Sequence, residues 1–199
     1  MTKFRHLIWM VIAAGGLILS ASQSQAQMRQ PDVGDQPGLL PDEAVELDPQ
    51  FRKTAVFYRT NEPPGTIIIS TQDRHLYLVQ GNGRALRYGI GVGREGFTWA
   101  GVKHVEKKAE WPDWHPPQEM IERQPYLPRF MAGGPGNPMG ARALYLGTTV
   151  YRIHGTNQPH TIGSAVSSGC FRLVNPDVID LYDRVPVGTK IVVRHAPVL

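Results

Sequence analysis

The stretch from Ile153 to Arg172 reads IHGTNQPHTIGSAVSSGCFR, and it carries most of what the sequence says about fold and function. It contains Cys170, the only cysteine of the 199-residue chain, and His154 sixteen positions before it. A single thiol has no disulfide partner within its own chain, so it is either an inert core residue or a reactive group. The histidine motif nearby favours a nucleophile with its base.

The residue types in this stretch fit that chemistry. A cysteine attacks as a thiolate, and because a free thiol has a pKa of about 8.5 it needs a base or a positive field near neutral pH. We expect His154 to take the proton and to return it to a leaving amine. Gly169 permits a tight turn in which consecutive N–H groups point at one oxyanion. Gly155 has no side chain, so we expect a backbone carbonyl to orient the other histidine nitrogen.

Arg172 lies two positions after Cys170. In an extended segment the two side chains share a face, and a guanidinium there can bind a substrate carboxylate with two parallel hydrogen bonds. A zinc site made of His154, His160 and Cys170 is the alternative. No paired-cysteine or HExxH spacing supports it, so we expect no metal.

Around this stretch the chain reads as strands. Apolar and β-branched runs predict strands at residues 65–70, 76–79, 85–92, 102–109, 143–148, 150–154 and 189–193. Gly81-Asn82-Gly83 predicts a hairpin turn, because glycine and asparagine tolerate positive φ. His154 then falls at the end of a strand. The pattern predicts a mainly β fold with one or two short helices.

Two segments predict those helices. The first is a short helix around residues 118–124. The second opens at Asn175, which we expect to be its N-cap, with Pro176 in the first turn. Its apolar face is formed by Val178, Leu181, Tyr182 and Val185.

The segment from Trp111 to Gly140 differs from the rest because it is rich in aromatic residues, proline and glycine. Such a composition excludes regular strands. A long irregular segment inside a compact domain is usually functional. We therefore expect it to form a wall or lid of the cleft over Cys170. The alternative is a cover for a sheet edge far from the chemistry.

The N-terminus predicts export. Lys3 and Arg5 precede an apolar run over residues 7–21, and Ser24-Gln25-Ala26 is a small-x-small cleavage pattern. These features predict a signal peptide over residues 1–26 and a periplasmic location. A membrane anchor is the alternative, but the run is about 15 residues, short of the roughly 20 needed to span a bilayer. Residues 27–52 are expected to be a flexible segment, and residues 53–199 one catalytic domain.

Charge and cysteine content exclude several classes of protein. The chain has 21 Lys and Arg against 17 Asp and Glu, and removal of Lys3 and Arg5 leaves a net charge of +2. No basic run or nucleic-acid motif is present, so we expect no nucleic-acid partner. An exported chain with one cysteine depends on an ordinary core for stability, since it forms no internal disulfide. We expect a monomer.

Several motifs together resemble the L,D-transpeptidase (YkuD-type) catalytic domain of the periplasmic Gram-negative type. They are His154-Gly155-Thr156, Ile162-Gly163, Ser167-Ser168-Gly169-Cys170-Phe171-Arg172, Gly91-Val92-Gly93-Arg94, Asn137-Pro138-Met139-Gly140 and the tail from Asn175 to Val193. The resemblance covers about residues 65–193. Two differences stand out: Ser168 replaces a histidine found in many members, and Thr98-Trp99-Ala100-Gly101 stands where a Thr-Pro-x-Gly turn is usual.

This resemblance implies a β-sandwich of mixed sheets and a reaction without a metal or organic cofactor. Cys170 would attack the meso-diaminopimelate carbonyl of a peptidoglycan tetrapeptide stem and expel D-Ala. An amine of a second stem, giving a 3→3 crosslink, or of a wall-anchored protein such as an outer-membrane protein or lipoprotein would then resolve the thioester. Water as acceptor would make the chain an L,D-carboxypeptidase. Acylation by carbapenems is also implied.

The resemblance also implies a wider site. Together with Arg172, the substrate-binding residues would be Ser167, Ser168, Thr156, Asn157 and Met139. Two other classes of protein remain open. A secreted cysteine peptidase would use the same Cys/His pair on ordinary peptides. A non-catalytic wall-binding module would keep the fold and lose the pair, and the presence of both His154 and Cys170 argues against it.

Overall fold

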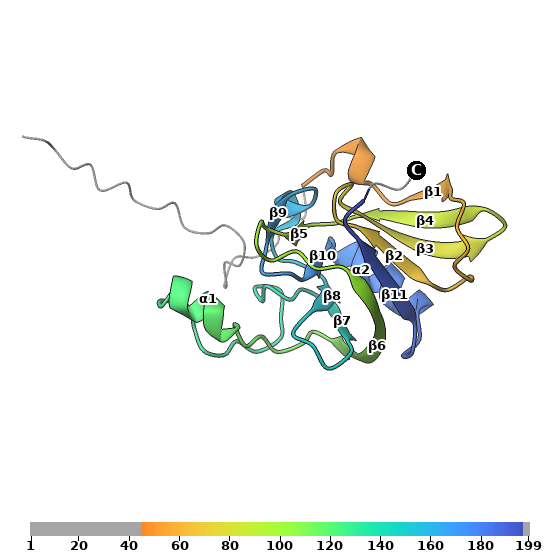
Figure 1. The fold of residues 1–199 in the computed structure, drawn as a ribbon. Helices are drawn as coiled ribbons and strands as arrows, with labels where there is room; N and C mark the ends of the chain where they lie inside the picture. The colour runs from red at the N-terminus through yellow and green to blue at the C-terminus, as the bar shows by residue number, and fades with distance from the viewer. Residues whose placement is uncertain (1–44, 197–199) are drawn as a thin grey trace, which may run out of the picture. The chain divides into compact units, whose positions relative to one another are not determined.

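A computed structural model describes residues 45–196 of the chain (Figure 1). The predicted signal peptide and residues 27–44 lie outside the described residues. The end of the segment expected to be flexible has a definite structure: a 3₁₀-helix, η1 (Pro49–Phe51), begins after Asp48, whose carboxylate accepts the Gln50 N–H. Phe51 contacts Gly89 and Gly163 so closely that a Cβ at either glycine would overlap it.

Within residues 45–196, nine strands form one continuous sheet, in the order β1-β4-β3-β2-β11-β6-β7-β8-β10, and β5 and β9 form a small second sheet. Both sheets contain parallel pairs: β2–β11 and β8–β10 in the first, β5–β9 in the second. The bounds are β1 (Thr54–Phe57), β2 (Ile67–Ser70), β3 (His75–Gly81), β4 (Arg84–Gly89), β5 (Val92–Gly93), β6 (Gly101–Glu110), β7 (Arg142–Leu146), β8 (Arg152–His154), β9 (Ala165–Ser167), β10 (Phe171–Arg172) and β11 (Lys190–Arg194).

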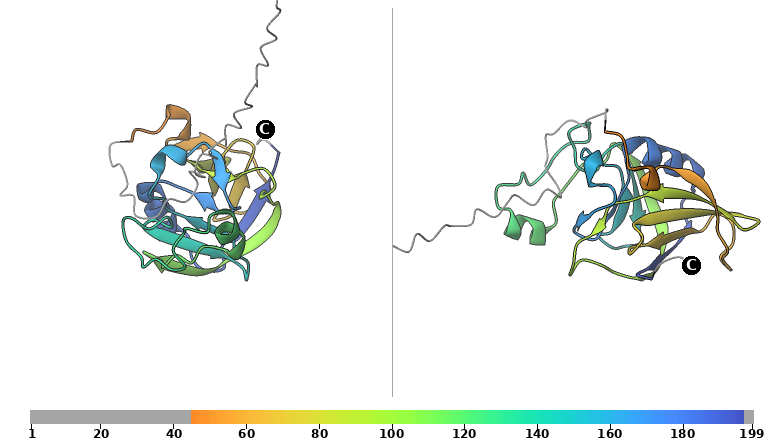
Figure 2. Two further views of the ribbon diagram at one scale, coloured as in Figure 1. Left: turned by 90° about the vertical axis from the view of Figure 1, so that its left-hand side faces the viewer. Right: turned by 90° about the horizontal axis from the view of Figure 1, so that it is seen from above.

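The long strand β6 joins the two halves of this sheet (Figures 1 and 2). Its first residues pair with β11, and its last residues pair with β7. The ladder with β7 shifts register between Val105 and Lys107, and such bulges bend a strand. Inner side chains from both halves therefore share one core, which explains the predicted sandwich of mixed sheets.

Strand β2 is buried along its whole length. Ile67 and Ile69 belong to the main core, whereas Ile68 points to the other face and contacts a smaller cluster that includes Tyr58 and Tyr77. A strand between a parallel and an antiparallel neighbour, covered on both faces, reads as a continuous apolar run. The Ile67–Ile69 run has this form.

Both predicted helices are present, as α1 (Gln118–Arg123) and α2 (Asn175–Arg184). The expected N-cap at Asn175 is wrong. The capping position is Val174, and the Asn175 Oδ1 atom accepts the Ala141 N–H at 2.9 Å. A Cβ at Gly140 or Gly155 would come within about 2.4 Å of that oxygen. Asn175 therefore ties the start of α2 to the chain on both sides of the β7–β8 pair.

The strand predicted at residues 85–92 is divided in the structure. β4 ends at Gly89, and the chain then leaves β3 to cross toward β10. Gly91 exchanges two backbone hydrogen bonds with Arg172, each 2.9 Å long. The following residues form β5, which pairs with β9. This crossing brings residues 91–94 beside the segment that contains Cys170.

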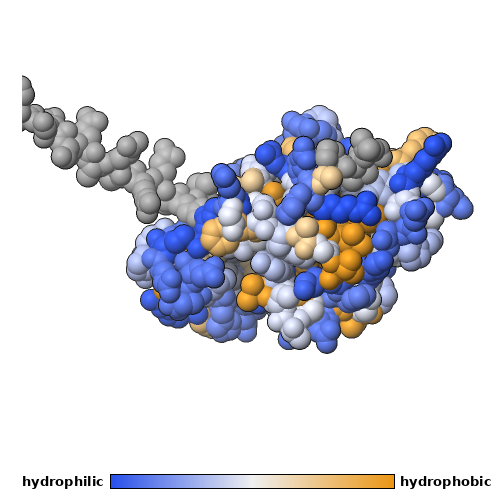
Figure 3. All heavy atoms as spheres, viewed as in Figure 1, coloured by the Kyte–Doolittle hydropathy of each residue, from blue (hydrophilic) through white to orange (hydrophobic). Residues whose placement is uncertain are grey.

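The surface seen in Figure 3 is mostly hydrophilic, with separate apolar patches. Large exposed apolar side chains in the described part include Phe57, Tyr126 and Val150. Among residues 45–196, no helix has both the length and the apolar character needed to cross a membrane.

Candidate active site

Cys170 sits in a tight turn between β9 and β10. The Ser167 hydroxyl donates to the Cys170 carbonyl oxygen at 2.6 Å and accepts the Gly169 N–H at 3.2 Å. Gly169 has a φ of +103°, and a Cβ there would strike the Tyr151 ring at 2.6 Å. Its N–H is used inside the turn, so its predicted oxyanion role rests on the turn it permits and not on its own N–H.

Two aromatic residues brace this turn. The Trp99 indole N–H donates to the Gly169 carbonyl oxygen at 3.0 Å, and its ring stacks on Tyr151 with centroids 4.7 Å apart. Trp99 lies where the sequence departs from the Thr-Pro-x-Gly pattern of the family. Sequence reasoning noted that departure but did not predict that the Trp99 indole would hold the turn before Cys170.

His154 ends β8 and is buried, with 3% of its surface exposed. Its Nδ1 atom lies 2.6 Å from the Gly155 carbonyl oxygen. Because a carbonyl only accepts, Nδ1 carries the proton and Nε2 has the free lone pair. Orientation of His154 by a backbone carbonyl was expected from Gly155, and the hydrogen bond confirms it.

The surroundings of His154 keep it neutral. Burial lowers the pKa of its imidazole to about 3, and the positive charges of Arg172 and Arg152 act in the same direction. The carbonyls of Gly155 and Met139 oppose them less strongly. A neutral imidazole at physiological pH is ready to accept a proton.

His154 and Cys170 line the same small cavity, of about 40 Å³. The Cys170 thiol faces the Val150 carbonyl oxygen at 3.7 Å. Six predicted site residues meet here: Cys170, His154, Arg172, Ser167, Ser168 and Met139. The other lining residues are Trp114, His115, Pro117, Met120, Val150 and Arg152, so the wall contains no acidic side chain.

Arg172 lines this cavity from β10. The register of β10 and β8 places it directly beside His154, and only 1% of its surface is exposed. Its charge lowers the pKa of His154, and its predicted contact with a substrate carboxylate stays a prediction.

Thr156 and Asn157 lie outside the cavity that contains Cys170. The Thr156 hydroxyl accepts the Gln158 N–H at 3.0 Å, and Asn157 Nδ2 donates to the Gly136 carbonyl at 3.3 Å. Both side chains are buried and shape the loop after His154. Thr156 instead lines a second, larger apolar cavity of about 620 Å³ with Trp111, Val174 and Ile179. Their positions give the predicted substrate role no support.

The segment between Trp111 and Gly140 forms one wall of the Cys170 cavity, as predicted. Trp114, Met120 and Met139 line it and belong to a cluster packed on Ala143 of β7. Trp114 and Met131 exchange two backbone hydrogen bonds. Three carbonyls of the segment surround the Asn137 amide nitrogen at 3.0–3.2 Å, and its oxygen accepts the Met139 N–H.

Arg123 of α1 fastens this wall to the opposite side of the cavity. Its Nη2 atom donates to the Ser168 hydroxyl at 3.0 Å. Its guanidinium lies 4.9 Å from the centroid of the Phe97 ring, and Arg94 lies 4.8 Å from the same centroid. Sequence reasoning missed these contacts, because nothing in the local pattern shows that α1 meets the turn before Cys170.

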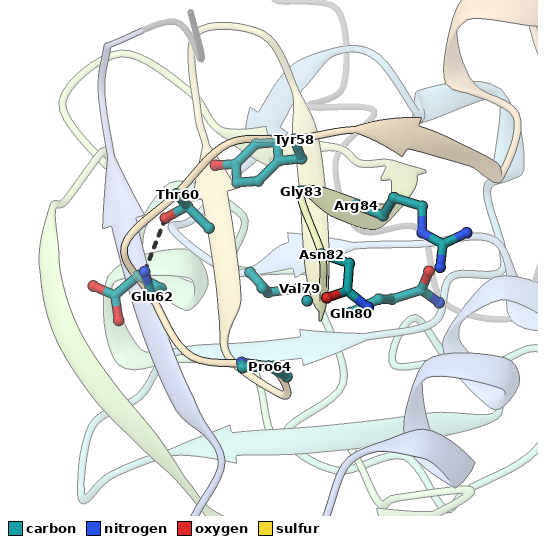
Figure 4. A pocket seen from close by; sticks show the side chains of 10 residues that line it. Tyr58, Thr60, Glu62, Pro64, Val79, Gln80, Asn82, Gly83 and Arg84 are labelled. Atoms are coloured by element: carbon teal, nitrogen blue, oxygen red, sulfur yellow. Dashed lines mark hydrogen bonds between the residues drawn. The ribbon is translucent and has the colours of Figure 1, made fainter.

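A further cavity, of about 350 Å³, lies at the β3–β4 hairpin (Figure 4). Its side chains are mainly polar, and Thr60 Oγ1 accepts the Glu62 N–H there. It contains no cysteine or histidine and belongs to the opposite end of the strand order from β10. Among residues 45–196, no three His, Cys, Asp or Glu side chains gather in a way that would hold a metal ion.

A thiol in a tight turn beside a neutral, oriented histidine is the arrangement of a Cys/His nucleophilic site. The family model of the L,D-transpeptidase (YkuD) catalytic domain matches residues 64–193 of this chain. The chain belongs to the L,D-transpeptidase family.

Curated relatives agree with this assignment. The probable L,D-transpeptidase ErfK/SrfK of Escherichia coli (strain K12) is 39% identical over 141 residues, which cover 66% of this chain and 44% of that protein. The chain therefore spans less than half the length of this relative.

Two solved structures are similar to the chain. L,D-transpeptidase 3 from Mycobacterium tuberculosis covers 65% of this chain and 60% of its own, with a TM-score of 0.51 and 14% identity, which shows a shared fold. A structure described as a probable carnitine operon oxidoreductase CaiA from Brucella melitensis is 51% identical, covers 74% of this chain and 96% of its own, and has a TM-score of 0.50. Its description names another activity, whereas the family model and the curated relatives agree on the L,D-transpeptidase family.

Proposed function

We propose that this chain is a peptidoglycan L,D-transpeptidase that forms a thioester on Cys170. The observation that carries the proposal is the cavity shared by Cys170 and a neutral His154, within a member of this family. His154 has its Nδ1 proton fixed by the Gly155 carbonyl, so Nε2 is the basic atom. A base of this kind contributes typically 10²–10⁴-fold to a rate.

In the first step His154 Nε2 takes the thiol proton and the Cys170 sulfur attacks the meso-diaminopimelate carbonyl of a tetrapeptide stem. The C–S bond forms, the bond to D-Ala breaks, and His154 returns its proton to the departing amine. In the second step an acceptor amine attacks the thioester, its proton passes to His154, and the thiolate leaves and is reprotonated. Cys170 and His154 therefore account for every bond and proton in the two steps.

The acceptor in this proposal is an amine of a second stem, giving a 3→3 crosslink, or of an outer-membrane protein or lipoprotein. Water as acceptor would give an L,D-carboxypeptidase. The narrow cavity and the wall formed by Trp114 and Met120 favour transfer, because a thioester that waits for an amine has to be shielded from water. The basic and apolar N-terminal segment that contains Lys3 and Arg5 supports a periplasmic location. In this proposal a single copy of the chain carries out the reaction.

Mass spectrometry of purified disaccharide-tetrapeptides incubated with the mature chain tests this function. We expect loss of D-Ala and formation of a diaminopimelate-to-diaminopimelate crosslink, and a covalent adduct with a carbapenem. Cys170→Ala should abolish both the products and the adduct. An adduct that persists in Cys170→Ala would refute the nucleophile, and cleavage of casein with inert tetrapeptides would instead indicate a cysteine peptidase.

A further inference from the structure

Two rows of side chains cross the sheet beside the active site. Strands β6, β7 and β8 lie next to one another (Figure 1), and side chains that pair across strands share a face of a sheet. One row consists of Ala109, Ala143, His154 and Arg172. The adjacent row consists of Lys107 on β6, Tyr145 on β7 and Arg152 on β8.

The second row leads to the nucleophile. The register of β8 and β10 pairs His154 with Arg172, so Cys170, two residues before Arg172, comes level with Arg152. The side chains agree with this placement. Arg152 Nη1 donates to the Val150 carbonyl oxygen at 2.9 Å, and the Cys170 thiol faces the same oxygen at 3.7 Å. Arg152 also lines the cavity that contains Cys170.

The row is held in place by its aromatic member. Arg152 lies 5.0 Å from the centroid of the Tyr145 ring, and Lys107 lies 5.4 Å from it. Cation–π contacts of this length fix the direction of long side chains. Among residues 45–196, neither Lys107 nor Arg152 forms an ion pair with an acidic side chain, although both remain at least partly exposed.

The wall segment contacts both rows. Ala143 of the first row belongs to the apolar cluster of the wall, and Tyr145 of the second row packs against that cluster. The Lys107–Tyr145–Arg152 row therefore passes beside the wall and reaches the Cys170 cavity at Arg152. It is a preorganised, positively charged approach to the thiol.

We infer that the Lys107–Tyr145–Arg152 row is the acceptor subsite, in which Arg152 binds a carboxylate carried next to the attacking amine. This inference rests on the proposed function and gives it an acceptor class, an α-amino carboxylate such as the free D-centre of a diaminopimelate. Arg152 holds the carboxylate while the neighbouring amine attacks the thioester carbon, the C–N bond forms and the C–S bond breaks. The amine proton passes to His154, and the thiolate is released.

The test compares two small acceptors on the mature chain loaded with a disaccharide-tetrapeptide. D-Methionine carries the carboxylate beside its amine, and D-methioninamide has a neutral amide in the same place. For Arg152→Gln we expect the KM for D-methionine to rise about tenfold, the usual scale for a lost hydrogen bond to a charged group. The KM for D-methioninamide should stay within about twofold of wild type. Lys107→Gln should show a smaller change of the same kind.

Arg84→Gln is the matched control, because it removes one exposed guanidinium at the β3–β4 hairpin, away from the row. Equal losses on both acceptors, or a changed acylation rate with unchanged selectivity, would show that Arg152 is only structural and would overturn the inference. If wild type forms the acyl-enzyme and transfers it, the proposed function survives that result. If wild type releases the acyl group only to water, both the transferase function and the acceptor subsite are refuted.

Discussion

His154 is neutral because of where the chain buries it. Its imidazole has lost almost all contact with water, and Arg172 and Arg152 add positive charge nearby. A charged imidazole is disfavoured in such surroundings, which is why its pKa falls to about 3. We expect the free enzyme to hold a neutral histidine and to use it as a general base, without a stable imidazolium in the resting state.

This neutrality predicts an unusual pH profile for acylation. A free histidine would lose its base function as the pH falls through about 6.5. In this chain the lowered pKa of His154 keeps the imidazole unprotonated at lower pH. The acid limb of the acylation rate should therefore lie below pH 5. Stopped-flow acylation by a carbapenem between pH 4 and 8 measures it. An acid limb centred near pH 6.5 would show that His154 titrates normally.

Removal of the base gives a second prediction at the same residue. His154→Ala should slow acylation at least about 100-fold at pH 7, the usual contribution of general-base catalysis. His160→Ala is the matched control, because His160 is exposed and does not line the cavity. A wild-type rate in His154→Ala would remove this residue from the mechanism.

The roles of single residues could be predicted only in part from the sequence. Cys170, His154 and the orienting role of Gly155 follow from residue type and motif, and the structure brings the Cys/His pair into one cavity. The roles of Arg152 and Trp99 cannot be predicted from the local pattern, because Arg152 shares a cavity with the distant Cys170 and Trp99 binds Gly169, 70 positions away in sequence. The one local signal for Arg152 was its two-residue spacing from His154, which puts both on one face of β8.

At the scale of elements, α1 and its segment control access to the thiol. The cavity of about 40 Å³ is small beside the ≈300–1,000 Å³ typical of ligand sites, so a stem peptide requires the wall to move. The contacts that close it include a hydrogen bond from Arg123 to Ser168 and the stacking of Arg123 on Phe97. Segments of this kind open and close over many active sites.

Loosening this closure should change the fate of the thioester. In Arg123→Ala we expect hydrolysis to rise relative to transfer by a few-fold, with acylation unchanged or faster, because water reaches the acyl-enzyme more often. Arg129→Ala, an exposed change in the same segment, should behave as wild type. Product ratios from mass spectrometry decide, and an unchanged ratio in Arg123→Ala would mean that the wall does not shield the intermediate.

The elements themselves were well predicted where the signal is local. The hairpin at Asn82 follows from glycine and asparagine, and these residues do adopt positive φ. The two wrong predictions concern elements whose bounds are set by tertiary contacts. The strand after that hairpin breaks because Gly91 bonds to Arg172, and Asn175 does not cap its helix because its oxygen serves Ala141. Neither partner is visible from the local pattern.

At the scale of the whole molecule, α2 contributes to the core and also carries a buried acid. Val178, Leu181 and Val185 pack into the main core shared by both halves of the sheet. Asp177, in the first turn of the same helix, is buried beside them. Burial raises the pKa of its carboxyl to about 6, and nearby Lys53 offsets only part of that effect.

This buried acid predicts how the stability of the folded chain depends on pH. Since the folded pKa is above the unfolded one, Asp177 favours folding only while protonated. That contribution is present below pH 4 and is lost as the pH rises through about 6. Asp177→Asn removes the ionisation and should raise the free energy of unfolding at pH 7.5 by about 1 kcal/mol, after the loss of a favourable helix-dipole contact.

Thermal unfolding of Asp177→Asn and wild type at pH 7.5 and pH 4 measures this difference. We expect the Tm of the variant to be higher by about 3 °C at pH 7.5, as such a free-energy change produces in a domain of this size, and the gap to close at pH 4. Asp183→Asn, an exposed change on the same helix, controls for the loss of one charge from the molecule. A gap of equal size at both pH values would mean that the amide improves packing, and that the cost of ionising Asp177 is not what limits stability.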